Sequence, residues 1–200
     1  KVGSKRQRRR AGPHGIVCVD KPEGPTSHTI VQRMKRRFGS GRVGHAGTLD
    51  PMATGVLVIL LGEATKLSQW VVAHDKVYDA EITFGQETDT DDRMGKVLDE
   101  KDIPEGVLTH DKLVEALATF TGAQDQVPPR VSAIRIDGRR LMEAARAGET
   151  IEAPPRRVHC HSIALKSLEL PKITVRVHCG SGYYIRALAR DLGRKLEVGA

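Results

Sequence analysis

The order of apolar and polar residues predicts several β-strands along the chain. Continuous apolar runs at Gly15–Val19 and Val56–Leu61 predict buried strands, the first of them central in its sheet. Strict alternation predicts half-buried strands over Lys76–Phe84 and Ile173–Cys179, with Tyr78 on the apolar face of the first. Further strands are predicted near Lys96–Leu98, Ser132–Ile136 and Arg156–Leu170.

Apolar residues spaced three and four apart predict helices between these strands. The first helix is capped by Ser27 and buries Ile30, Val31, Met34 and Phe38. The same spacing predicts four more helices: Ala64–Ala73 with Leu67, Trp70 and Val71 inward, one capped by Thr109 through Leu113, Val114, Leu117 and Phe120, one from Leu141 to near Gly148, and one through Ile185, Leu188, Leu192 and Leu196. Because strands and helices are interspersed irregularly, the predicted fold class is α+β, with a mixed or mostly antiparallel sheet flanked by helices.

Positive charge is the main feature of the composition. The formal net charge is +7 and the isoelectric point is near 9.5, which favours a polyanionic partner over a surplus that serves solubility alone. Basic residues gather in an arm at residues 1–13, predicted to be mobile, and on the outer face of the Ser27 helix at Arg33, Lys35, Arg36 and Arg37. No apolar stretch is long enough to cross a bilayer and no secretory signal is present, so a cytoplasmic protein is predicted.

Three cysteines, Cys18, Cys160 and Cys179, lie in apolar or alternating runs without a C-x-x-C spacing. They are predicted to be small core residues in a reducing compartment. The segments His159-Cys160-His161 and His178-Cys179 superficially resemble metal ligands. Strand alternation turns Cys160 away from its two neighbours, and no paired ligand spacing is present, so no metal site is predicted.

The most distinctive segment for chemistry is the run of small, turn-forming residues from Gly44 to Gly55, which contains a single carboxylate, Asp50. Pro51 biases Asp50 toward an extended or turn conformation, and an apolar strand follows. A rigidly supported loop is a common place for a reactive acid, but an aspartate that only stabilises a turn fits equally well. The sequence contains no phosphate-binding loop, dinucleotide fingerprint, serine-nucleophile elbow or H-E-x-x-H motif.

Taken together, the motifs resemble those of the TruB-type pseudouridine synthases. The central match is GHAGTLDPMATGVL at residues 44–57. Other matches follow in order along most of the chain: DKP at 20–22, GPTSH at 24–28, LGEATKL at 61–67, KVY at 76–78, TDTD at 88–91, VPP at 127–129, GYYIR at 182–186 and DLG at 191–193. The resemblance implies a pseudouridine synthase catalytic domain over residues 14–200.

This resemblance implies an isomerase that converts a uridine in the T-loop of tRNA, at tRNA position 55, into pseudouridine, without metal or organic cofactor. The base must be flipped out of its stack before the glycosidic bond is reachable. By resemblance Asp50 is the essential carboxylate, Arg186 pairs with it, and Tyr78 stacks on the uracil. The substrate-binding residues implied are His45, Tyr184, Lys21, Gly47, Thr48 and Leu49.

Two departures and two alternatives qualify the expectation. Val131 stands where the family often has an aromatic residue, and the chain ends at Ala200, whereas the family usually continues into further strands and a small RNA-binding domain. The resemblance therefore implies a catalytic domain incomplete at its carboxyl end, acting on tRNA as a monomer. The alternatives are a guide-RNA-dependent synthase of the archaeal and eukaryotic branch and a tRNA-folding chaperone.

Overall fold

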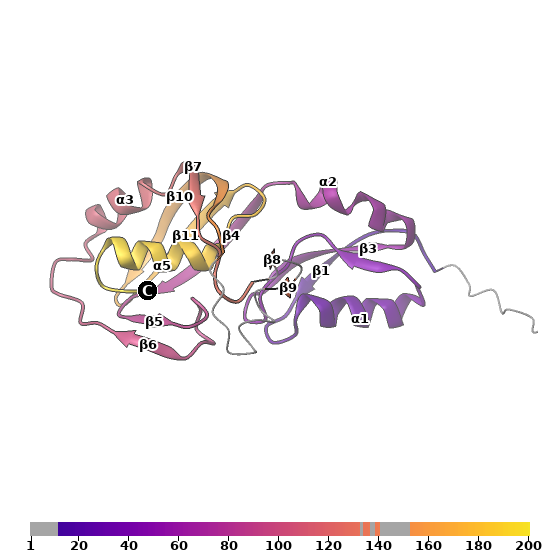
Figure 1. Cartoon of the computed structure of the whole chain (residues 1–200), viewed down its shortest axis with the longest axis horizontal. Helices are drawn as coiled ribbons and strands as arrows, with labels where there is room; N and C mark the ends of the chain where they lie inside the picture. Colours follow the sequence, from indigo (N-terminus) through magenta and orange to yellow (C-terminus); the bar gives the residue numbers. More distant parts are fainter. Residues whose placement is uncertain (1–11, 133, 137–138, 141–152) are drawn as a thin grey trace, which may run out of the picture. The chain divides into compact units, whose positions relative to one another are not determined.

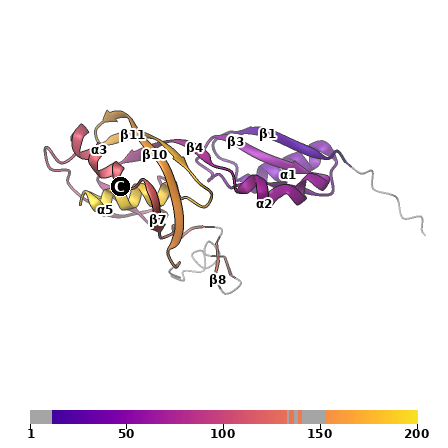
Figure 2. The ribbon, with the colours of Figure 1, turned by 90° about the horizontal axis from the view of Figure 1, so that it is seen from above.

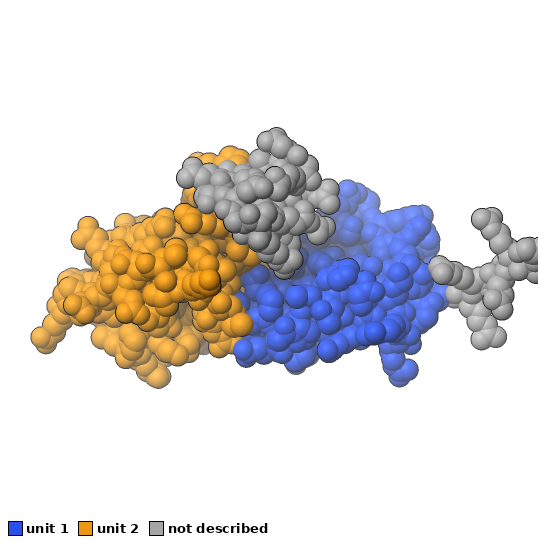
Figure 3. Space-filling model, turned by 60° about the horizontal axis from the view of Figure 1, so that its bottom comes forward, with its two compact units in different colours: residues 1–74 blue, residues 75–200 orange. Residues whose placement is uncertain are grey.

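A computed structural model describes residues 12–132, 134–136, 139–140 and 153–200. The chain divides into two compact units, residues 1–74 and 75–200 (Figure 3), and we describe each unit by itself. The predicted helix from Leu141 to Gly148 lies outside the described residues, as does the basic arm up to residue 11. The single catalytic domain over residues 14–200 stays a prediction.

The first unit is a three-stranded antiparallel sheet with a helix on one face (Figure 1). Its elements are β1 (Gly15–Lys21), α1 (Ser27–Phe38), β2 (Val43–His45), β3 (Gly55–Leu61), the 3₁₀ helix η1 (Gly62–Leu67) and α2 (Ser68–Val72). The strand order is β1-β3-β2. Ile30 and Val31 of α1 pack against Leu57, Ile59 and Leu61 of β3, and these residues form the core of the unit.

Three predictions for this unit are wrong, each because a face taken as buried is exposed. Gly15–Val19 was expected to be central, but β3 holds the central position among the described strands and β1 lies at the edge, where Ile16 and Cys18 are exposed. Val56, at the start of β3, is also exposed. The segment Ala64–Ala73 is a 3₁₀ turn followed by a short α-helix, and Trp70 is 59% exposed.

The second unit is built on a four-stranded antiparallel sheet with the order β4-β11-β10-β7. Its elements are β4 (Lys76–Thr83), β5 (Gln86–Thr88), β6 (Val97–Glu100), α3 (His110–Ala118), β7 (Gly122–Gln126), β8 (Arg135–Ile136), β9 (Arg139–Arg140), β10 (Arg156–Glu169), β11 (Lys172–Cys179) and α5 (Ile185–Lys195). Helices α3 and α5 lie on one face of the sheet (Figures 1 and 2), and Leu113, Leu117, Leu188 and Leu192 are buried in the core there.

The α+β class and the antiparallel pairing are confirmed, as are β4, β11, α3, α5 and the burial of Cys160 and Cys179. Strand β7 was not predicted, because GAQDQ has no apolar alternation and is a strand through its pairing with β10. Val114 was expected to face the core and is exposed. No helix in the described part of the chain is long and apolar enough to cross a membrane.

Candidate active site

Asp50 lies half-buried in the loop that joins β2 to β3, and the backbone on both sides of it is held in place. The carbonyl of Asp50 accepts a hydrogen bond from the Ala53 amide at 3.1 Å, which closes a tight turn. The next carbonyl, of Pro51, accepts from the Gly24 amide at 2.8 Å and from Lys21 Nζ at 3.1 Å. The loop is therefore fastened to the segment that follows β1.

Lys21 is the last residue of β1 and is fully buried, with 0% of its surface exposed. Its ammonium group donates to the carbonyls of Pro22 at 2.9 Å and Pro51 at 3.1 Å. Burial lowers the pKa of Lys21, and the negative charges of Asp50 and Glu23 oppose that shift. A buried cation thus supports the loop close to the Asp50 carboxylate.

Ser27 fixes the loop from the other side. It was predicted to be the N-cap of α1, but Thr26 is the cap, and its side-chain oxygen accepts from the Thr29 amide at 3.0 Å. The Ser27 hydroxyl, buried at the first position of the helix, donates to the Leu49 carbonyl and accepts from the Leu49 amide, both at 2.9 Å. Leu49 also packs against the core of the unit, so α1 directly positions the residue before Asp50.

His45 and Gly47 shape the start of the same loop. The Nδ1–H of His45 donates to the carbonyl of Gly47, and the Ala46 amide donates to the Val58 carbonyl at 2.9 Å. Gly47 has a φ of 103°, a backbone conformation that residues with a side chain rarely adopt. In a neutral His45 ring this hydrogen bond leaves Nε2 as an acceptor. Thr48 is exposed.

A shallow groove of about 500 Å³ lies between α1 and β2, and His45 is among its lining residues. Its lining is rich in side chains that can form hydrogen bonds: His28, Gln32, Lys35, Arg42 and His45. The other lining residues are Val31, Gly41, Val43 and Gly44. Lys35 and Arg42 are exposed, so their charges face solvent. The groove is suited to an anionic ligand that extends toward the Asp50 loop.

Lys21→Met is expected to lower the free energy of unfolding by about 2 kcal/mol. Each hydrogen bond to a charged group contributes roughly 1.5–3 kcal/mol, and loss of the burial penalty offsets part of the change. The measurement is urea unfolding followed by the fluorescence of Trp70, the only tryptophan, which lies in the first unit. The matched control is Lys66→Met, since the Lys66 side chain is 69% exposed and its surface pair with Glu63 should contribute under about 1 kcal/mol. Equal effects of the two substitutions would contradict the supporting role of Lys21.

The remaining predicted site residues belong to the second unit. Tyr78 is on β4 opposite Val177, and part of its side chain packs against the core, which leaves it half-buried. Tyr184 lies at the N-terminal end of α5, and Gln126 brackets its backbone: the Tyr184 amide donates to Gln126 Oε1 at 2.8 Å, and Gln126 Nε2 donates to the Tyr184 carbonyl at 3.0 Å. The Gln126 side chain thus fixes the entry to the helix that carries Arg186.

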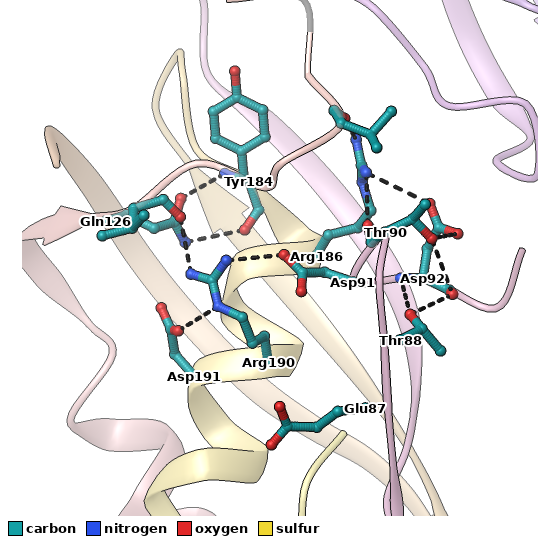
Figure 4. A network of polar contacts seen from close by, with 12 residues as sticks. Glu87, Thr88, Thr90, Asp91, Asp92, Gln126, Tyr184, Arg186, Arg190 and Asp191 are labelled. Atoms are coloured by element: carbon teal, nitrogen blue, oxygen red, sulfur yellow. Dashed lines mark hydrogen bonds and ion pairs between the residues drawn. The ribbon is translucent and has the colours of Figure 1, made fainter. Parts of the chain in front are cut away.

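Arg186 is in the first turn of α5 and only 10% of its side chain is exposed. Its guanidinium donates to two carbonyls, of Thr90 at 2.9 Å and of Val131 at 3.0 Å, and lies 3.5 Å from a carboxylate oxygen of Asp92 (Figure 4). The acidic turn Thr88–Asp92, which lies at the end of β5 and leads toward β6, is therefore a partner of Arg186.

Arg190, one helical turn further, was not predicted to matter and has a network of its own (Figure 4). It donates to Asp91 Oδ2, to Asp191 Oδ1 and to the Val127 carbonyl, each at 2.9 Å. Burial raises the pKa of Asp91, and the adjacent Arg190 opposes that shift. Arg190 and Asp91 are 99 residues apart, so no local pattern in the sequence signals this network.

The predicted site residues therefore fall into two groups. Lys21, His45 and the 47–50 segment meet around one loop of the first unit. Tyr78, Tyr184 and Arg186 belong to the second unit. The pairing of Arg186 with Asp50 stays a prediction.

Comparison with known proteins identifies the family of the chain. Residues 35–185 match the TruB family pseudouridylate synthase, N-terminal domain. A tRNA pseudouridine synthase B from Syntrophotalea carbinolica is 43% identical over 94% of this chain and 60% of its own length. The enzyme of the same name from Opitutus terrae is 42% identical over 93% and 76%. That from Thermobifida fusca is 46% identical over 92% and 65%. The chain thus spans about 60 to 76% of these relatives.

Solved structures with a similar fold come from ribonucleoprotein complexes. The structure titled as a Cbf5-Nop10-Gar1 complex matches with a TM-score of 0.68 and 30% identity, over 93% of this chain and 45% of that one. A structure titled as an H/ACA ribonucleoprotein bound to a substrate RNA containing 2'-deoxyuridine matches with a TM-score of 0.64 and 27% identity, over 93% and 44%. The described fold is therefore that of a pseudouridine synthase catalytic domain.

Proposed function

Because the chain belongs to the TruB family of pseudouridylate synthases, we propose that it isomerises a uridine in the T-loop of tRNA, at tRNA position 55, to pseudouridine. The observation that carries the proposal is the Asp50 loop. It holds one carboxylate between a buried lysine and a buried serine, and it has the family's signature sequence. Relatives that are 42 to 47% identical are tRNA pseudouridine synthases.

The proposed reaction breaks the C1′–N1 bond of the uridine, rotates the uracil and joins C1′ to C5. The proton that C5 loses is balanced by one gained at N1, so the product is an isomer and no oxidant or reductant is consumed. Asp50 is the proposed reacting carboxylate. Its backbone is fixed by the contacts of Leu49 and Pro51, which limits the positions that the carboxylate can take and lowers the entropy lost at the reacting centre.

Tyr78 and Arg186 are proposed to complete the pocket. The ring of Tyr78 would stack on the flipped uracil, which helps to offset the cost of unstacking the base. The Arg186 fork would orient the Asp50 carboxylate and keep it ionised. Tyr184 is proposed as a wall of the pocket, and His45 as a contact to the RNA loop from which the base has left.

The groove between α1 and β2 is the proposed path of the RNA backbone toward Asp50. Lys35, Arg42 and His45 line it, and His45 also belongs to the start of the Asp50 loop, so phosphate contacts along the groove would direct the flipped nucleotide to the loop. Other exposed cations on α1, Arg36 and Arg37, extend the positive surface. This surface is the feature of the first unit that best accounts for the surplus of positive charge.

The direct test incubates the protein with a T-arm stem-loop transcript and maps pseudouridine at single-nucleotide resolution. Product at the T-loop uridine, without guide RNA or other proteins, is expected. Turnover only when a guide RNA is added would instead favour the guide-dependent branch, and RNA binding or refolding without any product would favour the chaperone.

Binding to the T-arm should weaken steeply with salt, because phosphate contacts release counterions. Lys35→Gln is expected to reduce the slope of log K against log salt by roughly 1, the share of one phosphate contact. Lys172→Gln is the control, since its ammonium is already paired with Glu81 at 2.8 Å. The measurement is fluorescence anisotropy of a labelled stem-loop between low and high salt. An unchanged slope in Lys35→Gln would remove the groove from the RNA path.

A further inference from the structure

Two histidines and an aspartate meet on the face of the second unit's sheet that is opposite α3 and α5. Asp75 Oδ2 lies 3.1 Å from His161 Nε2 and 3.7 Å from His178 Nε2, and the ligand atoms of all three side chains lie within 4.8 Å of one another. Among the described residues this is the one group of three or more with such spacing. We propose that Asp75, His161 and His178 form a binding site for Zn²⁺ or a chemically similar divalent transition-metal ion.

The strand register explains how residues so distant in sequence meet. Cys179 pairs with Lys76 on β4 and with Cys160 on β10. Asp75 immediately precedes Lys76, His178 precedes Cys179 and His161 follows Cys160, so each proposed ligand is next to this row of paired residues. The register of β10 against β11 shifts between Cys160 and Ser162, and His161 is the extra residue of that bulge. Bulges often redirect a side chain, and here the bulged residue is one of the three proposed ligands.

The ligand geometry suits zinc. With Zn–N and Zn–O bonds of about 2.0–2.2 Å, the edges of a tetrahedral site measure about 3.4 Å, and the two Asp75–histidine distances bracket that value. Two imidazoles and one carboxylate are a common set for zinc, whereas Mg²⁺ and Ca²⁺ prefer oxygen ligands alone. Three protein ligands leave the fourth position to water, which the partly exposed side chains allow.

The surroundings hold the ligands in place. The ring of His161 lies between those of His159 and His178, with centroid distances of 4.6 and 4.5 Å. Cys160 and Cys179 point to the opposite, buried face, as strand alternation predicts, and are not part of the site. The expectation of no metal site rested on ligand spacing along the chain. Asp75 and the two histidines are far apart in sequence, so only the register of the sheet reveals the group.

The site is separate from the proposed reaction. None of the predicted uridine-pocket residues belongs to it, and its three ligands lie in or directly next to β4, β11 and β10, which are neighbours in the sheet. A bound ion would therefore act as a clamp that ties the beginning of β4 to β10 and β11. Without the ion, Asp75 still contacts His161 at 3.1 Å and His178 at 3.7 Å.

The test titrates tag-free protein with Zn²⁺ against a chromophoric competitor, in a Cys18→Ser background because the Cys18 thiol is exposed and could bind zinc by itself. One ion per chain is expected. His161→Ala and His178→Ala should each weaken the affinity by at least about tenfold, the lower end of losses seen even for residues that support metal ligands indirectly. The matched control is His159→Ala, which removes a neighbouring imidazole outside the proposed ligand set and should change the affinity by less than about twofold.

Two further measurements distinguish a specific zinc site from nonspecific zinc binding. Long-range ¹H–¹⁵N spectra should show zinc-dependent shifts of the Nε2 atoms of His161 and His178. A hundredfold excess of Zn²⁺ over its dissociation constant should raise the melting temperature by roughly 5–10 °C. Binding that does not saturate, that is lost with Cys18→Ser alone, or that falls equally in His159→Ala would overturn the proposal.

Discussion

Asp50→Asn is expected to abolish pseudouridine formation while the affinity for the T-arm stays within about threefold of the parent chain. Removal of a group that takes part in acid–base or covalent catalysis typically costs 10²- to 10⁴-fold, and we expect a loss of at least about 10³-fold. An asparagine has the same shape, so the backbone contacts that hold the loop, from Ser27 to Leu49 and from Lys21 to Pro51, should persist.

The measurement is single-turnover formation of pseudouridine in a T-arm stem-loop, together with anisotropy binding of the same RNA. Single-turnover conditions remove product release from the rate, so the loss reports the chemical step. Retained turnover in Asp50→Asn would eliminate the carboxylate mechanism. Loss of both turnover and binding would indicate that Asp50 serves the fold of the loop, which is the alternative that the sequence left open.

Asp89→Asn is a matched control for this substitution, because Asp89 lies in the acidic turn of the second unit. Its Oδ1 accepts a hydrogen bond from the Lys96 amide at 2.8 Å, which is a local turn contact. An asparagine oxygen can accept the same bond, so the exchange should leave the rate within about twofold, as for most substitutions that keep the partner satisfied. A comparable loss in both variants would show that the assay reports net charge and not chemistry.

Elements with a strong local period were predictable from the sequence. The alternation in β4 and β11 and the apolar spacing in α1 and α5 each depend on a single buried face, so periodicity alone identifies them. Strand β7 could not be identified in this way, because its sequence is polar and it forms a strand only by pairing with β10. The prediction that Trp70 is buried was wrong for a similar reason. The sequence shows that the residue is apolar, but not whether another part of the fold covers it.

The residues of the candidate site could be predicted where they belong to a sequence motif. They could not be predicted where contacts between distant parts of the chain fix their positions. The glycine- and proline-rich sequence around Asp50 indicates a displayed acid. The hydrogen bonds between Ser27 and Leu49 join residues that are 22 positions apart in the sequence. The hydrogen bond from Lys21 to the Pro51 carbonyl joins residues that are 30 positions apart. A local pattern carries no information on such pairs. The same holds for Arg190, whose partner Asp91 is 99 residues away.

Arg186→Lys is expected to lower the single-turnover rate by at least about 100-fold, the cost of a small misplacement of a reacting group. The Arg186 guanidinium reaches two carbonyls at once, of Thr90 and Val131, through two different nitrogens. A lysine has one ammonium at the end of a flexible chain and cannot reproduce that fork. The charge would remain, but its position relative to the substrate pocket would be lost.

The matched control is Arg194→Lys, two turns further along α5, where the side chain is 58% exposed and pairs with Glu87 at 3.6 Å. That exchange should change the rate by less than about twofold, because exposed ion pairs contribute little and depend weakly on geometry. Arg190→Lys provides a second comparison. It disturbs a buried network on the same helix and should lower the unfolding free energy by roughly 1–3 kcal/mol through lost hydrogen bonds.

These three variants separate catalysis from folding. If Arg186 serves the reaction, its variant loses rate out of proportion to its unfolding free energy, whereas Arg190→Lys loses stability out of proportion to rate. If Arg186 only anchors α5 to the acidic turn, the two variants and the parent chain should fall on one line of rate against stability. An unchanged rate in Arg186→Lys would remove this arginine from the site. The guanidinium would then act, like that of Arg190, as a buried tie between α5 and the loops at its N-terminal end.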